Sequence, residues 1–315
     1  MKKITKSNYF KAYITNVNGF LLSKNRIKKQ PNYYYKNKIM LQEEGTKYLQ
    51  TLIQSGKPFA AARFGSTELG CINNFLKVKL FMQKSFKNQV KYGMENYSGF
   101  FPADDKNLFK FGELMQTLYP EVDLLAVFNI FMEDFVVQTF CENAKLLHLR
   151  SIDPIATHWT KVLKGKKVLV IHPFAELIEE QYKKRELLFT DNEILPEFQL
   201  SVFPAVQTIA GVKDERFNSW FEALDYMISE IRNFDFDIAL IGAGAYGLPL
   251  AVKIKCDLKK QAVHIGGATQ LLFGIKGKRW DDRPDYNNIY NEHWVRPGEK
   301  FIPSGANRVE NGCYW

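Results

Sequence analysis

The strongest constraint on the fold is an alternation of short apolar runs with segments of helix length. Patterns of helical periodicity lie before or between these runs, at residues 38–56, 173–189 and 217–234. The runs themselves, each rich in strand-forming residues, cover 57–65, 122–128, 145–151, 166–174, 198–205, 236–243 and 261–268. Strands that alternate with helices form right-handed crossovers in a parallel sheet. The sequence therefore predicts an α/β fold, a mainly parallel sheet with helices on both faces, in one domain over residues 41–315.

Positive charge is concentrated at the N-terminus. Residues 1–40 contain ten Lys or Arg and no acid, whereas the remainder carries 33 basic and 34 acidic residues. Because the body is almost neutral, we expect no nucleic-acid-binding surface across the fold. Phe10 and Ile14 are among apolar residues that recur at helical spacing, so this basic arm is predicted to be helical. Its apolar face either lies on an anionic membrane surface or packs on the protein's own core.

The lengths of the apolar stretches and the spacing of the cysteines indicate the cellular compartment. No stretch approaches the roughly 20 uninterrupted apolar residues that span a bilayer, and the first 25 residues lack the pattern of a secretory signal. The four cysteines lie far apart without a C-x-x-C pair, which is typical of buried, reduced thiols rather than of disulfides or a zinc site. We therefore expect a cytoplasmic protein.

One glycine-rich loop follows a predicted strand. Gly242, Gly244 and Gly247 have the G-x-G-x-x-G spacing that lets a backbone approach a phosphate at a helix N-terminus. A dinucleotide site also needs an acid about 20 residues later, but the next strand ends in His264-Ile265-Gly266-Gly267. A nicotinamide or flavin cofactor is therefore not favoured. Phosphate binding and a purely structural turn stay open.

A second loop, Arg63 to Glu68, also follows a strand. Arginine at a strand end can bind a phosphate bidentately, and Gly65 permits the turn. Glu68, in the first turn of the next helix, can accept from a sugar hydroxyl, bind a metal or act as a base. The alternative is an Arg63–Glu68 ion pair with Glu68 capping the helix. Since ligands bind at the carboxyl ends of parallel strands, we expect these loops to converge with a third one that begins at His172.

The segment "AARFGSTELG" resembles the "RFGDGE" signature of the GT-D type glycosyltransferases. The similarity extends to "FDIALIGAGAYGLPLAVKIK", "QAVHIGGATQLLFGIKGKRW" and the tail "NEHWVRPGEK…VENGCYW", and covers about residues 57–315. It implies a Rossmann-like sheet that binds a nucleotide diphosphate sugar, in a protein of bacterial surface-polysaccharide synthesis. In the family two acids of the signature contact Mn²⁺ or Mg²⁺. Here Glu68 keeps one acid, but Ser66 stands in place of the other, which puts the metal in doubt.

The predicted function is transfer of a sugar from a nucleotide diphosphate sugar to a bacterial glycan, free or lipid-linked. The alternatives are a dinucleotide-binding oxidoreductase and a non-catalytic interaction protein. Glu68, His172 and Asp281 are the candidates for the catalytic base. Contacts to the acceptor or to phosphate are expected from Lys276, Lys278, Arg279 and Trp280. The predicted donor site comprises Arg63, Gly65, Ser66, Thr67, Gly242, Gly244, Gly247, Gly266, Gly267, Thr269 and Gln270.

Overall fold

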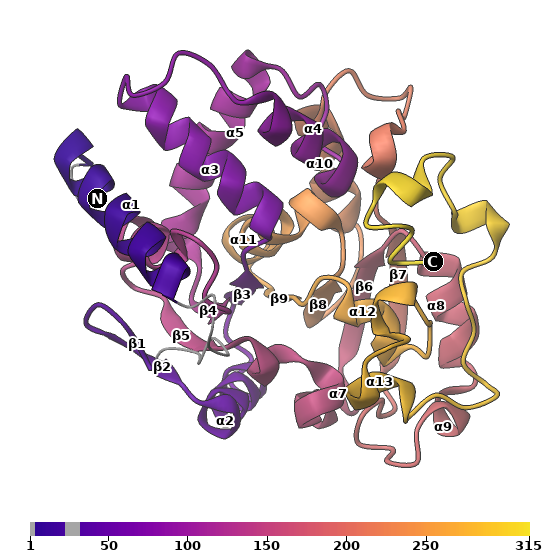
Figure 1. The fold of residues 1–315 in the computed structure, drawn as a ribbon. Coiled ribbons are helices and arrows are strands. Elements are labelled where there is room, and N and C mark those ends of the chain that lie inside the picture. Colours follow the sequence, from indigo (N-terminus) through magenta and orange to yellow (C-terminus); the bar gives the residue numbers. More distant parts are fainter. Residues whose placement is uncertain (1–3, 23–31) are drawn as a thin grey trace.

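The structure is a computed structural model that describes residues 4–22 and 32–315. Its strands are β1 (Tyr33–Tyr34), β2 (Asn37–Met40), β3 (Phe59–Arg63), β4 (Leu124–Val127), β5 (Lys145–His148), β6 (Lys167–His172), β7 (Gln199–Pro204), β8 (Ile238–Ile241) and β9 (Gln261–His264). They form one nine-stranded sheet in the order β1-β2-β5-β4-β3-β9-β8-β6-β7 (Figure 1). Every pairing is parallel except that of β1 with β2.

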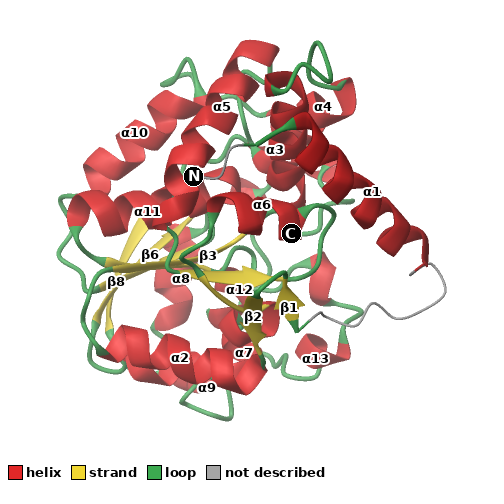
Figure 2. Cartoon of the chain, turned by 90° about the vertical axis from the view of Figure 1, so that its left-hand side faces the viewer, coloured by secondary structure: helices red, strands yellow, loops and turns green. Residues whose placement is uncertain are grey.

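Helices cover both faces of the sheet, which confirms the predicted fold class (Figure 2). The helices on one face are α1 (Lys6–Leu22), α3 (Ser66–Lys79), α4 (Asn88–Ser98), α5 (Asp105–Leu118), α6 (Glu133–Phe140), α10 (Trp220–Ile231) and α11 (Gly247–Leu258). Those on the other are α2 (Gln42–Gln54), α7 (Pro154–Thr157), α8 (Ala175–Tyr182), α9 (Arg185–Leu188), α12 (Ala268–Leu272) and α13 (Pro284–Asn287).

Buried side chains of the strands alternate between the two faces. In β3, Ala60 and Ala62 face the core on the α11 side, whereas Phe59 and Ala61 face the opposite core. Small residues let α11 lie close to β3 and β9. This arrangement joins the sheet's two halves at β3–β9, where Ala60 is in register with Ala262.

All seven predicted strands are present, but two of the predicted helices differ. The helix predicted over 38–56 begins only at Gln42, because Ile39 and Met40 belong to β2 and pair with Leu146 and Leu147. The helix predicted over 173–189 is divided into α8 and α9. The boundary at residue 40 thus falls at the end of a strand of the main sheet.

Helix α1 packs against the body of the protein. Tyr9 and Ala12 are buried, and the Tyr9 ring lies edge-on to Phe135 with centroids 5.6 Å apart. Phe10 and Ile14 of the predicted apolar face are instead exposed. Six of the ten basic residues of the arm lie outside the described residues: Lys2, Lys3, Lys24, Arg26, Lys28 and Lys29. None of the described helices is long and apolar enough to cross a membrane.

Candidate functional site

One cavity lies at the carboxyl ends of β3, β6, β8 and β9, near the centre of the sheet. The loops that begin at Arg63, His172 and Gly242 all line it, together with Gly266 and Gly267 after β9. Parallel strands present these ends at the same edge, which explains why segments far apart in the sequence meet here. The structure therefore brings the three predicted loops together.

Arg63 ends β3 with its guanidinium against the loop after β9. Its Nη1 donates to the carbonyl of Phe64 at 3.2 Å. Gly266 has a φ of +63°, and a Cβ atom there would lie 2.3 Å from Nη2 of Arg63. Among the ion pairs of the described residues, none involves Arg63. The guanidinium is thus positioned by backbone and keeps its charge uncompensated.

Glu68 folds back over the start of its own helix. Gly65 is the N-cap of α3, and a Cβ atom on it would lie 1.7 Å from Oε2 of Glu68. A side chain at position 65 would therefore displace the carboxylate from this place, where it faces the positive end of the helix. The alternative ion pair with Arg63 is not formed. Both side chains line the cavity independently, as do Ser66 and Thr67.

The cavity contains two buried histidines in opposite hydrogen-bonding arrangements. Nδ1 of His172 accepts from the backbone N–H of Phe174 at 3.0 Å, so a neutral ring carries its proton on Nε2. His264 lies with Nδ1 3.2 Å from the carbonyl of Ile241, which can only accept, so its proton is on Nδ1. Burial lowers the pKa of each to about 3, and Arg63 adds to the effect at His264. Both rings are neutral near pH 7.

These assignments limit what His172 can do. Its single acceptor nitrogen is already occupied by Phe174, and its Nε2–H can only donate. His172 therefore fits the role of a hydrogen-bond donor and not the predicted role of a base.

The glycines of the G-x-G-x-x-G loop make room for these histidines. A Cβ atom on Gly242 would lie 2.6 Å from Cδ2 of His172, and one on Gly247 would lie 2.1 Å from Cε1 of His264. Gly244, with a φ of +50°, lines the cavity with its backbone. Close packing thus accounts for Gly242 and Gly247, and Gly247 itself does not line the cavity.

The C-terminal segment completes the cavity. Arg279 donates from Nη1 to the Tyr314 hydroxyl at 3.2 Å, and its guanidinium carbon lies 4.7 Å from the centre of that ring. Its Nη2 is 2.6 Å from a carboxylate oxygen of Glu310. Burial raises the pKa of Tyr314, and the positive charges of Arg279 and Arg63 oppose that rise. Tyr314 thus lies within the electrostatic reach of both arginines.

Sequence reasoning did not assign Glu310, Tyr314 or Trp315 to the site. The tail "VENGCYW" belongs to the resemblance, but aromatic residues near the end of a chain carry no signal of where they pack. Gln270 links this tail to the sheet: its buried Nε2 donates to the carbonyls of Lys276 and Tyr314.

Several residues predicted for the site lie elsewhere. Asp281 does not line the cavity; both its carboxylate oxygens bind Nη2 of Arg296, the closer at 2.7 Å. Lys276 lies over the Tyr290 ring, and Lys278 donates to the carbonyl of Asn311. The remaining residues outside the cavity lining are Gly247, Thr269 and Trp280. Each is held by packing or hydrogen bonds of its own, as the Thr269 hydroxyl is by the carbonyl of Gly266.

The donor atoms do not fit a Mn²⁺ or Mg²⁺ site. These ions prefer several oxygen ligands, including carboxylates. Next to Glu68 the signature loop offers only the hydroxyls of Ser66 and Thr67 and no second carboxylate, and Glu310 is engaged by Arg279. No group of three or more His, Cys, Asp or Glu residues capable of holding a metal occurs within the described parts of the chain.

One family model matches part of the chain. Residues 150–272 match the model of the GT-D-like family, a GT-D fold-like domain. Two solved structures each align over 84% of this chain and 97% of their own, with 11% identity and a TM-score of 0.42. Both are of domain of unknown function 1792, which one of them describes as having a distinct glycosyltransferase fold. No curated protein matches the chain.

Proposed function

The GT-D-like region at residues 150–272 bears out the resemblance predicted from the sequence, and from that premise we propose that the protein is a glycosyltransferase using a nucleotide diphosphate sugar. The family and the fold support glycosyl transfer in general. The donor, the acceptor and the roles of single residues are our proposal and rest on the geometry of the cavity.

The observation that carries the proposal is the uncompensated charge of Arg63. A half-buried guanidinium without a carboxylate partner is costly unless an anion binds to it. Its position at the carboxyl end of a central strand, beside the exposed Ser66 and the start of α3, suits a diphosphate. Arg63 would bind the diphosphate of the donor.

Arg279 supplies a second cation to the same cavity. Glu310 and the Tyr314 ring hold its guanidinium in place. The Tyr314 hydroxyl is a further donor within reach of a bound phosphate. We place the diphosphate between the two arginines, where positive charge stabilises the departing group.

This arrangement supports transfer that does not depend on a metal ion. The expectation of Mn²⁺ or Mg²⁺ came from the family signature, and Ser66 removes one of its two acids. Arg63, which has no ion-pair partner among the described residues, can provide positive charge that a divalent ion supplies elsewhere, and Arg279, paired with Glu310, adds oriented hydrogen-bond donors.

Of the three predicted bases, Glu68 is the one that lines the cavity and has carboxylate oxygens available to accept a proton. The acceptor hydroxyl attacks the anomeric carbon as the bond from that carbon to the diphosphate oxygen breaks. The diphosphate leaves with the bonding electron pair, and the hydroxyl proton passes to Glu68. Nε2–H of His172 would orient a sugar hydroxyl or a phosphate oxygen by donating to it.

The acceptor we propose is a bacterial glycan, free or linked to a lipid. A lipid-linked acceptor calls for an enzyme at the inner face of the plasma membrane, and the basic residues of segment 1–40 would attract it to anionic lipids. Cytoplasmic location and peripheral membrane association form part of this proposal.

Neither alternative gains support from the site. An oxidoreductase would need the glycine loop for a dinucleotide, but Gly242 and Gly247 make room for histidines, and no carboxylate follows β9. A non-catalytic interaction protein would keep the cavity without turnover and is tested by assay.

The test is a panel of UDP-, GDP- and TDP-linked sugars, with a CMP-linked sugar as the monophosphate comparison, and binding is measured by calorimetry and thermal shift. We expect one donor to bind and to bind at least about tenfold more weakly to Arg63→Ala, since a charged hydrogen bond contributes roughly 1.5–3 kcal/mol. Arg216→Ala is the matched control, because Arg216 pairs with Asp214 away from the cavity lining. Indifference to the whole panel would contradict the proposal. Binding without turnover would favour the interaction protein.

A further inference from the structure

Helix α3 ends in a turn that has phenylalanine where glycine is usual. Phe81 has a φ of +55°. Its N–H donates to the carbonyl of Val78 at 3.0 Å, and the N–H of Met82 donates to the carbonyl of Lys77 at 2.8 Å. This pair of bonds is the Schellman motif, in which the left-handed residue is generally Gly because a Cβ atom is strained there.

The Phe81 side chain contributes little to the fold that could offset this strain. It is 87% exposed, the highest value among the large exposed apolar residues of the described chain. Burial of apolar area is what phenylalanine normally provides to stability. A strained residue without such a gain indicates a function outside the folded core.

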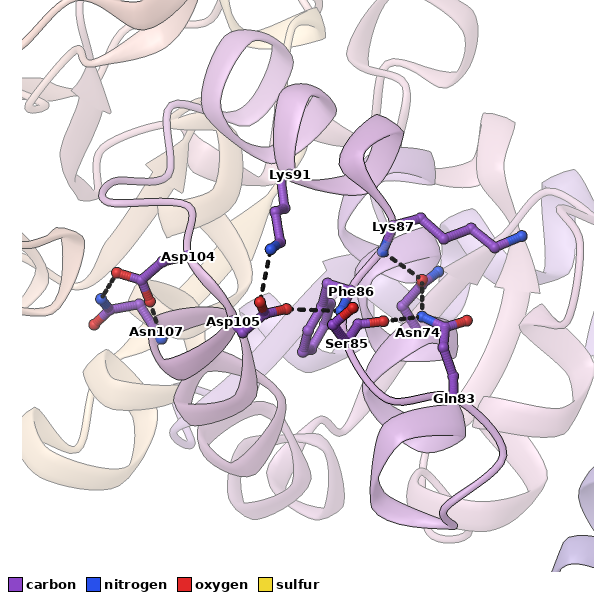
Figure 3. Close-up of polar contacts among 9 residues, drawn as sticks. All are labelled: Asn74, Gln83, Ser85, Phe86, Lys87, Lys91, Asp104, Asp105 and Asn107. Carbon is purple, nitrogen blue, oxygen red and sulfur yellow. Dashed lines mark hydrogen bonds and ion pairs between the residues drawn. The ribbon is translucent and has the colours of Figure 1, made fainter.

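The loop that follows is fixed by a polar network (Figure 3). The Asn74 Oδ1 accepts from Gln83 Nε2 at 3.1 Å and from the backbone N–H of Lys87 at 3.4 Å. Asp105 accepts from the N–H of Phe86 at 2.7 Å and pairs with Lys91 at 2.7 Å. The network anchors the loop between α3, α4 and α5. Phe81 and Met82 are therefore presented on a rigid support.

Helix α1 lies beside α3 and exposes apolar residues of its own (Figures 1 and 2). The Tyr9 hydroxyl donates to the carbonyl of Asn73, and Lys77 Nζ lies 4.6 Å from the centre of the Tyr13 ring. On the face turned from these contacts, Phe10 is 56% and Ile14 is 41% exposed. One turn separates the two, so they form a short apolar stripe.

Positive charge surrounds these apolar side chains without acidic neighbours in the sequence. Residues 1–42 and 69–94 contain no Asp or Glu. Apart from Lys36 in the β1–β2 turn, six lysines of these two stretches make no ion pair in the part of the chain that the structure describes: Lys6, Lys11, Lys77, Lys79, Lys84 and Lys87. Burial and the neighbouring charge of Lys87 lower the pKa of Lys77. The packing of α1 on α3 brings two acid-free stretches together, and an acid from outside them, Asp134, contacts α1, where it accepts from Asn16 Nδ2 at 3.0 Å.

We propose that this α1–α3 surface, made of Phe10, Ile14, Phe81, Met82 and these six lysines, docks on an anionic membrane. The apolar side chains insert at the interface, and the lysines bind the lipid headgroups. The phenyl ring of Phe81 is almost fully exposed, as an apolar group that inserts into a deformable lipid interface would be. The inference does not depend on the proposed glycosyl transfer.

Substitution of Phe81 separates binding from folding. Phe81→Gly relieves the left-handed strain, so its midpoint of urea unfolding is expected to be no lower than that of the unsubstituted chain. Its binding to vesicles of phosphatidylcholine with about 30% phosphatidylglycerol, measured by co-sedimentation, is expected to fall at least about fivefold. Leu187→Ser, at a 52% exposed residue of α9, is the control and should bind normally.

Charge reversal tests the second half of the surface. Lys84→Glu with Lys87→Glu is expected to abolish the preference for anionic over pure phosphatidylcholine vesicles, because attraction depends on basic residues near the surface. Lys183→Glu with Lys184→Glu, on exposed lysines before α9, should retain it. Failure of the intact chain to bind anionic vesicles, or equal binding to neutral ones, would overturn the proposal. Donor binding, assayed without lipid, decides the proposed function separately.

Discussion

The His264 imidazole fills the space that any side chain at position 247 would need, because a Cβ atom on Gly247 would lie 2.1 Å from Cε1 of the ring. The third glycine of the G-x-G-x-x-G pattern is therefore explained by packing between α11 and β9. The spacing is typical of dinucleotide-binding loops, but here Gly247 makes room for a histidine that is buried beside the cavity.

Gly247→Ala should destabilise the protein by about 1–3 kcal/mol, since His264 has no room to move without disturbing Ile241. Urea unfolding measures the change. Gly70→Ala, within α3 and with no atom within 4 Å of the added Cβ, is the control and should stabilise by roughly 0.5–1 kcal/mol. Equal effects of the two substitutions would refute this account of Gly247.

Both cavity histidines should stay neutral across the physiological range. Their pKa values of about 3 are set by burial, so their imidazole NMR signals are expected not to shift between about pH 8 and about pH 5. Because the folded-state pKa values lie below those of the unfolded chain, the stability these groups contribute is lost as the pH falls from about 6.5 toward 3. His172→Gln assigns the signals. A titration near pH 6.5 by either ring would contradict its burial.

Glu133 gives the protein an opposite pH dependence. Its buried carboxylate accepts from the Tyr34 hydroxyl at 2.7 Å and from the N–H of Phe128 at 3.2 Å, yet burial raises its pKa to about 7. A folded-state pKa above the unfolded value means that stability is full below about pH 4.5 and falls as the pH rises through about 7.

Relative to Glu133→Gln, the unsubstituted protein should therefore lose up to roughly 3 kcal/mol between about pH 4.5 and about pH 8. Denaturant unfolding of both proteins at the two pH values isolates this contribution, because the histidines affect both equally. Parallel pH profiles would show that Glu133 ionises as it does in the unfolded chain.

The signature loop predicts how metal dependence can be introduced. Donor binding by the unsubstituted chain should be the same with EDTA as with Mn²⁺, since Arg63 supplies the positive charge and Arg279, held by Glu310, supplies further hydrogen-bond donors. Ser66→Asp restores a second carboxylate beside Glu68 and should bind Mn²⁺ measurably by calorimetry. Ser55→Asp, at the exposed end of α2, controls for added charge. Loss of donor binding in EDTA would disprove the two-arginine arrangement without disproving glycosyl transfer.

The sequence predicts most strands of the sheet but not β1 and β2, which form one of its edges. Apolar runs bounded by turn residues predict each of the seven strands from β3 to β9. The helical periodicity of residues 38–56 includes Ile39 and Met40, since their strand is only four residues long and its pairing with β5 depends on contacts distant in the chain. On α1, hydrophobicity favoured Phe10 and Ile14 as the buried face. Tyr9 and Ala12 are buried instead, because a tyrosine that reaches Asn73 and a small alanine allow close approach.

The loops of the site could be located, but their contacts could not. Position after a strand predicts that Arg63, His172 and Gly242 share one edge. Position after a strand does not reveal that His172 Nδ1 accepts from the N–H of Phe174, or that Asp281 pairs with Arg296. Both contacts depend on side-chain packing. Tyr314 was missed for the same reason: only the folded tail brings it to Arg279.

The cavity can bind a ligand only after β3 and β9 have paired, because each strand contributes part of its lining. Arg63 comes from the first half of the chain and Gly266 from the last quarter, so a partly folded molecule that contains only one half of the sheet has no cavity to bind a donor. Occupancy of the cavity would then serve as a probe of global assembly in refolding experiments, and a tightly bound ligand would stabilise the joined halves by mass action.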